Sequence, residues 1–130
     1  MPFSHLIDPA LGIVWVAGEG LVTDEDLIRL AHQVSTDPLF GPKMRLLCDW
    51  SEVTQSKVTQ VGIAYEVANS RFSDSSRRAY VVRGGPETQV VAYLTAYSSP
   101  AEALNIRTFQ RKADAIAWLN EGAGPGQMLS

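Results

Sequence analysis

Three short segments carry the residue types that could hold a ligand, and each comes at the end of an expected β-strand. They are Asp49-Trp50-Ser51, Arg83-Gly84-Gly85 and Gln110-Arg111. Because open α/β sheets bind ligands beyond the carboxyl ends of their strands, these segments should lie on one edge of the sheet. The paired glycines could offer backbone N–H groups to an anion, although a tight turn into the next helix explains the same residues. The candidate ligand- or partner-binding residues are Asp49, Trp50, Ser51, Arg83, Gly84, Gly85 and Arg111.

Cysteine and histidine do not form a catalytic or metal-binding set in this sequence. A Cys48 nucleophile needs a nearby base, and the two histidines, His5 and His32, belong to an expected N-terminal strand and to the first expected helix. We expect Cys48 to be a buried strand residue. Two histidines far apart in sequence make a poor zinc site, and no phosphate-binding or dinucleotide fingerprint occurs. The sequence therefore predicts no catalytic residue, no metal and no cofactor.

Asp24, Glu25 and Asp26 are acidic residues that could also be considered for acid or metal chemistry. Their place directly after Thr23 offers a simpler explanation, because a threonine side chain caps a helix and acids stabilise the positive end of its dipole. We interpret them as the first turn of a helix.

The composition indicates one globular domain and excludes several classes of function. The chain has 130 residues, of which 45% are apolar and 19% charged, and a formal net charge of −3. An acidic protein lacks the basic stripe that nucleic-acid binding requires. No apolar run approaches the ~20 residues of a membrane span, the N-terminus lacks the pattern of a signal peptide, and a single cysteine forms no internal disulfide. We expect a cytoplasmic protein without a membrane span.

Short β-rich runs alternate with helical patterns along the whole chain, which is typical of βα units. Residues 51–57 form a polar stretch read as a loop, and Val58, Val61, Tyr65 and Ala68 follow it with helical spacing. Pro86 suits the first position of a later helix. Strands are expected at 5–8, 13–18, 44–50, 79–83 and 104–109, and helices from 24, 58, 86 and 112. The predicted order is β-β-α-β-α-β-α-β-α, a single α/β domain over residues 1–122 with a mostly parallel five-stranded sheet, an antiparallel N-terminal edge strand and a mobile tail at 123–130.

The order of four segments resembles the SpoIIAA-like group of the STAS superfamily, the domain type of anti-sigma-factor antagonists. The resemblance covers about residues 3–121. It depends on Ile7-Asp8-Pro9-Ala10-Leu11-Gly12-Ile13-Val14, on Val22-Thr23-Asp24-Glu25-Asp26-Leu27, on Leu46-Leu47-Cys48-Asp49-Trp50-Ser51-Glu52-Val53, and on the closing run from Phe109 to Leu119. It implies the STAS-like fold and a regulatory, non-enzymatic role.

The same resemblance implies a phosphorylated serine at the start of the second helix. Counted from Asp49 without gaps, the Asp-Ser pair of those relatives falls on Lys57 and Val58, so the switch serine is absent. Nearby hydroxyls remain candidates for phosphorylation, with helix capping as the alternative explanation. They are Ser51, Thr54, Ser56 and Thr59.

Aromatic residues and a sheet face without cover suggest two further properties. The aromatics are numerous enough to line an apolar cavity, although filling of the core is the simpler account. They are Trp15, Trp50, Tyr65, Tyr80, Tyr93 and Tyr97. If the strand order follows the chain order, helices gather on one face of the sheet, and the apolar surface left on the other face favours a homodimer.

We therefore expect a non-enzymatic binding or regulatory module that holds a protein partner or small ligand at the carboxyl edge of the sheet. The alternative is a carrier of a small apolar ligand or lipid in an aromatic-lined pocket, as CRAL-TRIO domains of related fold would allow. An enzyme that uses Cys48 or Ser51 is the third hypothesis.

Overall fold

The computed structural model describes residues 2–85 and 87–130, so the expected helix-starting role of Pro86 lies outside the described residues. The elements are β1 Phe3–Asp8, β2 Ile13–Thr23, α1 Asp24–Thr36, β3 Arg45–Lys57, α2 Gln60–Ala68, β4 Arg78–Val81, α3 Glu87–Tyr97, α4 Pro100–Ala103, β5 Ile106–Phe109 and α5 Lys112–Asn120.

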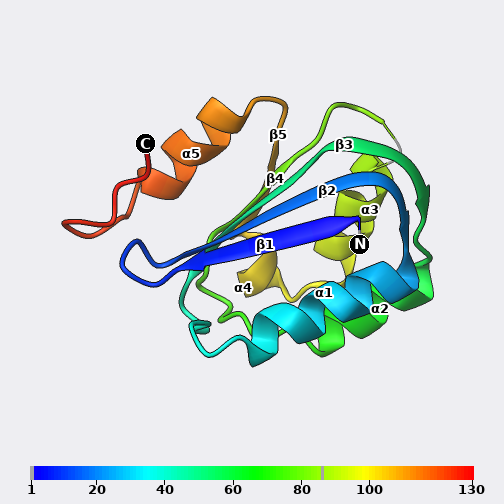
Figure 1. Cartoon of the computed structure of the whole chain (residues 1–130), viewed down its shortest axis with the longest axis horizontal. Helices are drawn as coiled ribbons and strands as arrows, with labels where there is room; N and C mark the ends of the chain where they lie inside the picture. The colour runs from blue at the N-terminus through cyan, green and yellow to red at the C-terminus, as the bar shows by residue number, and fades with distance from the viewer. Residues whose placement is uncertain (1, 86) are drawn as a thin grey trace.

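The five strands form one sheet in the order β1-β2-β3-β4-β5 (Figure 1). β1 is antiparallel to β2, and the other three neighbouring pairs are parallel. This confirms the predicted α/β fold with an antiparallel N-terminal edge strand. Crossovers of one hand between strands in sequence order bring α1, α2 and α3 to the same face of the sheet.

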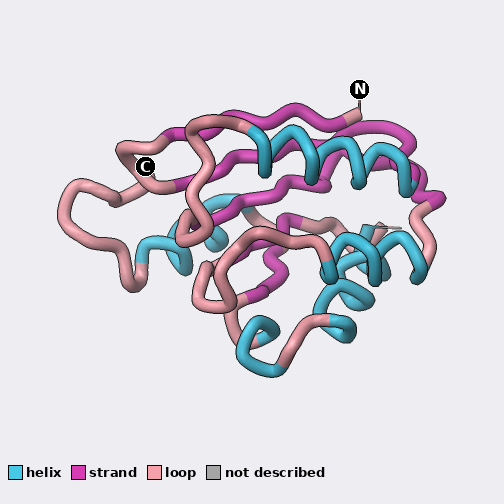
Figure 2. The backbone as a smooth tube through the Cα atoms, turned by 90° about the horizontal axis from the view of Figure 1, so that it is seen from below, coloured by secondary structure: helices cyan, strands magenta, loops and turns pink. Residues whose placement is uncertain are grey.

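The sheet separates two apolar clusters, one on each of its faces. Val14 and Val16 of β2 point into the cluster under α1, α2 and α3, whereas Ile13 and the partly buried Trp15 belong to the cluster under α5. This alternation follows from the two-residue period of a strand. Figures 1 and 2 show α5 on the opposite side of the sheet from α1 and α2.

β3 is longer than predicted, and the expected loop at 51–57 is wrong. The strand continues to Lys57 because β2 continues beside it, with parallel pairing up to Thr23 and Lys57. Polar residues are compatible with a strand when a neighbour satisfies their backbone groups. The register shifts at two points in β2, one of them next to Gly20, whose φ of 68° is typical of glycine. Figure 1 shows both strands bending past the end of β4 toward α1 and α2.

The start of α1 confirms the predicted cap. The Thr23 hydroxyl accepts a hydrogen bond from the Asp26 N–H, and the Asp26 carboxylate accepts one from the Thr23 N–H at 2.9 Å. This reciprocal pair is a capping box, and the acids of the first turn lie at the positive end of the helix dipole.

The helical spacing of Val58, Val61, Tyr65 and Ala68 predicts an inward stripe on α2, and this prediction is wrong. Val61 is 79% exposed and Tyr65 53% exposed, whereas Gly62 and Ile63 are buried. The helix is apolar around most of its circumference, so spacing alone could not select the inward side. Contact with α1 selects it: Gly62 lies so close to the carboxylate of Asp24 that a Cβ there would overlap it unless the Asp24 side chain moved.

Two smaller differences concern the C-terminal part of the chain. The short helix α4 was not expected. In α5 the buried residues are Ala115, Trp118 and Leu119, while Ala113 and Ala117 are exposed. Beyond α5, Leu129 is buried and its backbone forms two hydrogen bonds with the Asn120 side chain. These contacts place Leu129 against the end of α5, and mobility of residues 123–130 stays a prediction.

Candidate ligand-binding site

At the carboxyl edge of the sheet, the side chains of Asp49 and Trp50 lie on opposite faces. Trp50 is only 2% exposed and points into the core under the helices, where its indole N–H donates to Cys48 Sγ at 2.9 Å. The Asp49 carboxylate accepts a hydrogen bond from the Ser51 N–H. Asp49 therefore lies at the surface on the α5 side, and Trp50 belongs to an interior site.

The backbone donors of the Gly84-Gly85 turn are already used by the chain itself. Glu87 Oε1 accepts hydrogen bonds from the N–H groups of Arg83 at 2.8 Å and Gly85 at 3.1 Å. Glu87 is 2% exposed, so this carboxylate occupies the position that an external anion would take. Arg111 lies at the surface and pairs with Asp114 at 3.0 Å. Binding by these residues stays a prediction.

A cavity of about 90 Å³ lies between the sheet and the helices α1, α2 and α3. Its wall is almost entirely apolar and aromatic. Strands supply Val16, Leu46, Cys48, Trp50 and Tyr80; helices supply Leu27, Leu30, Ala31, Val34, Ser35, Ile63, Glu66, Val90, Val91 and Leu94; and loops supply Phe40, Asn69, Ser70, Arg71 and Phe72.

The cavity opens between the C-terminal halves of α1 and α2. Among its lining residues Asn69 and Arg71 are exposed, and Ser35 and Ser70 are partly exposed, whereas the residues from β3 and β4 are buried. The rings of Phe40 and Phe72 meet edge to face beside this opening, with centroids 5.2 Å apart. The mouth therefore lies near the amino ends of the strands, away from the predicted carboxyl edge.

Glu66 of α2 is the acidic residue among those that line the cavity. Its Oε2 atom is shielded from solvent and has no hydrogen-bond partner among the described residues. Burial raises the pKa of Glu66 from its ordinary 4.5 to about 7. Because a buried polar atom without a partner is costly, this carboxyl group requires explanation.

Cys48 and Tyr80 lie on adjacent strands beside the cavity and are both protonated at neutral pH. Burial raises the pKa of the Cys48 thiol to about 12, with the Trp50 hydrogen bond acting in the opposite direction. Burial also raises the pKa of Tyr80 well above its ordinary value. A thiol in this state is a poor nucleophile, which agrees with the expectation of a buried strand cysteine.

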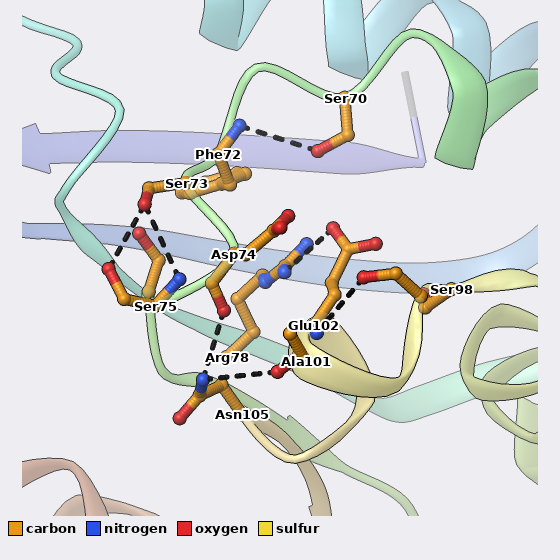
Figure 3. Close-up of polar contacts among 12 residues, drawn as sticks. Ser70, Phe72, Ser73, Asp74, Ser75, Arg78, Ser98, Ala101, Glu102 and Asn105 are labelled. Carbon is orange, nitrogen blue, oxygen red and sulfur yellow. Dashed lines mark hydrogen bonds and ion pairs between the residues drawn. The ribbon is translucent and has the colours of Figure 1, made fainter.

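A buried ion pair reinforces the sheet next to Tyr80. Arg78 of β4 donates to Glu102 of α4 at 2.8 Å, and the two side chains are 5% and 10% exposed (Figure 3). The guanidinium also lies over the ring of Phe72, 5.7 Å from its centroid. Because Phe72 lines the cavity, the pair connects α4 and β4 to the cavity wall.

The hydroxyls proposed for phosphorylation have different environments. Thr59 caps α2 by accepting from the Gly62 N–H and donates to Asp24 Oδ2 at 2.6 Å, and Ser56 accepts from the Val58 N–H. Thr54 is exposed on β3. A phosphate on Thr59 would lose the cap and face a carboxylate, so this residue is the least suited to modification in the folded state.

Residues 2–85 and 87–130 contain no group of three or more histidine, cysteine or acidic side chains that could hold a metal ion. No helix there has the length and apolarity to cross a bilayer.

The family model described as SpoIIAA-like matches residues 13–120, which is most of the chain. The protein belongs to the SpoIIAA-like family. The solved structure of an uncharacterized DUF3478-family protein from Shewanella loihica PV-4, described as having a SpoIIAA-like fold, is similar with a TM-score of 0.57 and 16% identity, over 90% of this chain and 93% of that one. The comparison with curated proteins finds no match.

Membership of the SpoIIAA-like family confirms the resemblance seen in the sequence. SpoIIAA-like and STAS domains are in general non-enzymatic, regulatory or binding modules, and the fold suggests such a module here. The family does not indicate Glu66. Its signal in the sequence is a lone carboxylate within an apolar helix, Val61-Gly62-Ile63-Ala64-Tyr65-Glu66-Val67-Ala68, which could have been recognised as a buried acid.

Proposed function

We propose that this SpoIIAA-like domain is a non-enzymatic module that binds a small, mostly apolar molecule in the cavity under α1, α2 and α3. The observation that carries the proposal is the cavity itself, an apolar space that opens between two helices and is lined by Glu66, whose Oε2 atom is shielded and has no hydrogen-bond partner among the described residues. Ligand sites are typically apolar pockets with a few polar groups that orient the ligand. Burial raises the pKa of the Cys48 thiol to about 12, which makes it a poor nucleophile and supports binding over catalysis.

The volume of the cavity limits the size of the ligand. An apolar cavity of about 150 Å³ holds benzene, and pockets for drug-sized molecules have about 300 to 1,000 Å³. At about 90 Å³ this cavity suits a compact ligand or one short side group. A lipid chain would require α1 and α2 to separate, so the small ligand is the better form of the carrier hypothesis.

Binding of a protein partner at the carboxyl edge is the second candidate. Val61 and Tyr65 form an exposed apolar pair one turn apart on α2, close to where β3 ends, and patches of this kind favour protein interaction. Arg83 and Arg111 are exposed and could contribute charge at the edge. Phosphorylation of exposed hydroxyls such as Thr54, and a cytoplasmic location, remain predictions.

Self-association through the sheet is a further part of the proposal. α5 covers the outer face over the central and C-terminal strands, whereas Leu6 of β1 is 66% exposed there next to its cross-strand partner Trp15. A homodimer would bury this surface. Light scattering on the Leu6→Lys variant should report a monomer where the wild type is a dimer, and a monomeric wild type at high micromolar concentration would refute it.

The small-ligand proposal is tested by NMR with isobutanol as a neutral probe. Shifts should concentrate on the backbone amides of cavity residues such as Ile63 and Val91. In the Ala31→Leu variant the added carbons fill the cavity and should abolish these shifts. Ala92→Leu, the same change at an exposed position of α3, is the matched control and should bind like the wild type. Equal binding to Ala31→Leu, or no binding at all, would contradict the proposal.

A further inference from the structure

We propose that the ligand of the cavity is a small apolar amine whose ammonium group pairs with the carboxylate of Glu66. The inference rests on the proposed function and specifies the chemistry of the ligand. It starts from the Oε2 atom of Glu66, which is shielded from solvent and lacks a hydrogen-bond partner among the described residues.

The protein supplies no cation for Glu66 within the part of the chain that the structure describes. Three arginines form ion pairs elsewhere: Arg77 pairs with Glu121, Arg78 with Glu102 and Arg111 with Asp114. Arg71 is the basic residue among the described cavity-lining residues, and it is exposed at the mouth. Burial alone raises the pKa of Glu66, without a lowering contribution from any positive charge.

An ammonium group supplies both the hydrogen-bond donor and the positive charge that Glu66 lacks. It donates hydrogen bonds to the free oxygen, and it supplies the opposite charge where the low dielectric strengthens an ion pair. A carboxylic acid as ligand would place a second acid beside Glu66, which is unfavourable once either is ionised. Charge complementarity therefore favours a cation over an anion.

The walls of the cavity also suit a cation with an apolar body. Aromatic rings of Phe40, Trp50, Phe72 and Tyr80 line it, and aromatic faces attract ammonium groups. Aliphatic side chains such as Ile63 would contact the hydrocarbon part. By proportion to the cavity of about 150 Å³ that holds benzene, a space of about 90 Å³ takes roughly four non-hydrogen atoms, and a fifth can extend into the mouth. n-Butylamine is a ligand of this size.

The affinity for an amine should depend on whether Glu66 is ionised. Cys48 on β3 and Tyr80 on β4 stay protonated at neutral pH, Arg71 lies in the following loop at the mouth, and the lining residues from α1 and α3 have no titratable side chain. Raising the pH from 6 to 8 crosses the pKa of Glu66, about 7, while an alkylamine with a pKa near that of lysine remains charged. The ionised fraction of Glu66, and with it the amine affinity, should rise about tenfold.

The test compares n-butylammonium chloride with 1-butanol by NMR titration at pH 6 and pH 8. With the wild type, we expect the ammonium ion to shift the amides of cavity residues and to bind about tenfold more tightly at pH 8. Glu66→Gln should lose this affinity by about tenfold or more at pH 8 and become insensitive to pH, while butanol binding persists. Glu25→Gln, at an exposed position in the first turn of α1, is the matched control and should behave as the wild type.

Each other outcome has a definite meaning. If butanol binds and butylammonium does not, or if Glu66→Gln leaves ammonium binding unchanged, the amine inference is overturned and the small-ligand proposal stands. If neither probe binds to the wild type, both fail. Should Glu66→Gln not fold, Glu66→Leu replaces it, since an apolar side chain suits this apolar site and also removes the charge.

Discussion

Replacing Glu66 by glutamine should stabilise the unliganded protein above pH 7 and have little effect below pH 5. The reason is the cost of ionising a carboxyl group that the fold has removed from water without supplying a partner. Glutamine has nearly the same shape and remains neutral, so it keeps the packing of α2 and removes the charge.

The magnitude follows from the difference between the folded and unfolded pKa values of Glu66. The pKa is about 7 in the folded protein, against an ordinary 4.5. Between these two pH values the folded state binds more protons than the unfolded state, so stability falls as the pH rises. At about 1.4 kcal/mol per pKa unit, the wild type should lose about 3 kcal/mol of unfolding free energy across this range.

Urea denaturation followed by tryptophan fluorescence at pH 5 and pH 8 measures this effect. Trp50 lies in the core beside the cavity and should report the loss of its packing. The stability of Glu66→Gln relative to the wild type should rise by about 2 to 3 kcal/mol from pH 5 to pH 8. Glu25→Gln, which changes an exposed acid, should show no such increase.

A relative stability that is the same at both pH values would refute the reasoning, because it would mean that Glu66 ionises as freely in the folded protein as in the unfolded chain. A relative stability that falls from pH 5 to pH 8 would also refute it, because the pKa of Glu66 would then be lowered by folding. Neither result depends on the identity of any ligand.

The remaining predictions concern the ion pair, the helix cap and the thiol. Glu102→Ala should lower the unfolding free energy by about 3 to 5 kcal/mol in urea denaturation, because it leaves the Arg78 guanidinium buried and unpaired; a loss below about 1 kcal/mol would show the pair to be hydrated. Thr59→Ala removes the cap of α2 and the hydrogen bond to Asp24 and should cost about 1 kcal/mol by thermal unfolding, whereas an unchanged midpoint would contradict the cap. Cys48 should react with a thiol-specific disulfide reagent only at the rate of unfolding, since the buried thiol has a pKa of about 12; rapid labelling of the native protein would disprove its burial.

Local chemistry explains where the sequence-based interpretation succeeded. The Thr23 hydroxyl and the acid three residues later specify the start of α1, and the apolar alternation in 13–18 specifies a strand with two buried faces. Both signals act between residues close in the chain, so the order of elements, the parallel sheet and the family resemblance could be predicted from them.

Contacts between distant segments decided what the sequence could not. β3 extends to Lys57 because β2 lies beside it, and α2 turns Tyr65 outward because Gly62 must approach Asp24. In each case the local pattern allows two arrangements, loop or strand for residues 51–57 and either side of α2 turned inward. A contact with a residue more than thirty positions away determines which one forms.

The candidate site depends on tertiary structure in the same way. The sequence by itself determined an acidic, single-domain α/β chain without a recognisable catalytic set, and it placed the expected ligand at the strand ends. Occupation of the Gly84-Gly85 turn is a local effect, because Glu87 accepts from the N–H groups of Arg83 and Gly85 within four residues of the chain. The tertiary structure turned Trp50 inward to line a cavity that opens between α1 and α2. Only the packing of these helices on the sheet shields Glu66 Oε2 from water, because desolvation is produced by neighbours from several segments and not by spacing along the chain.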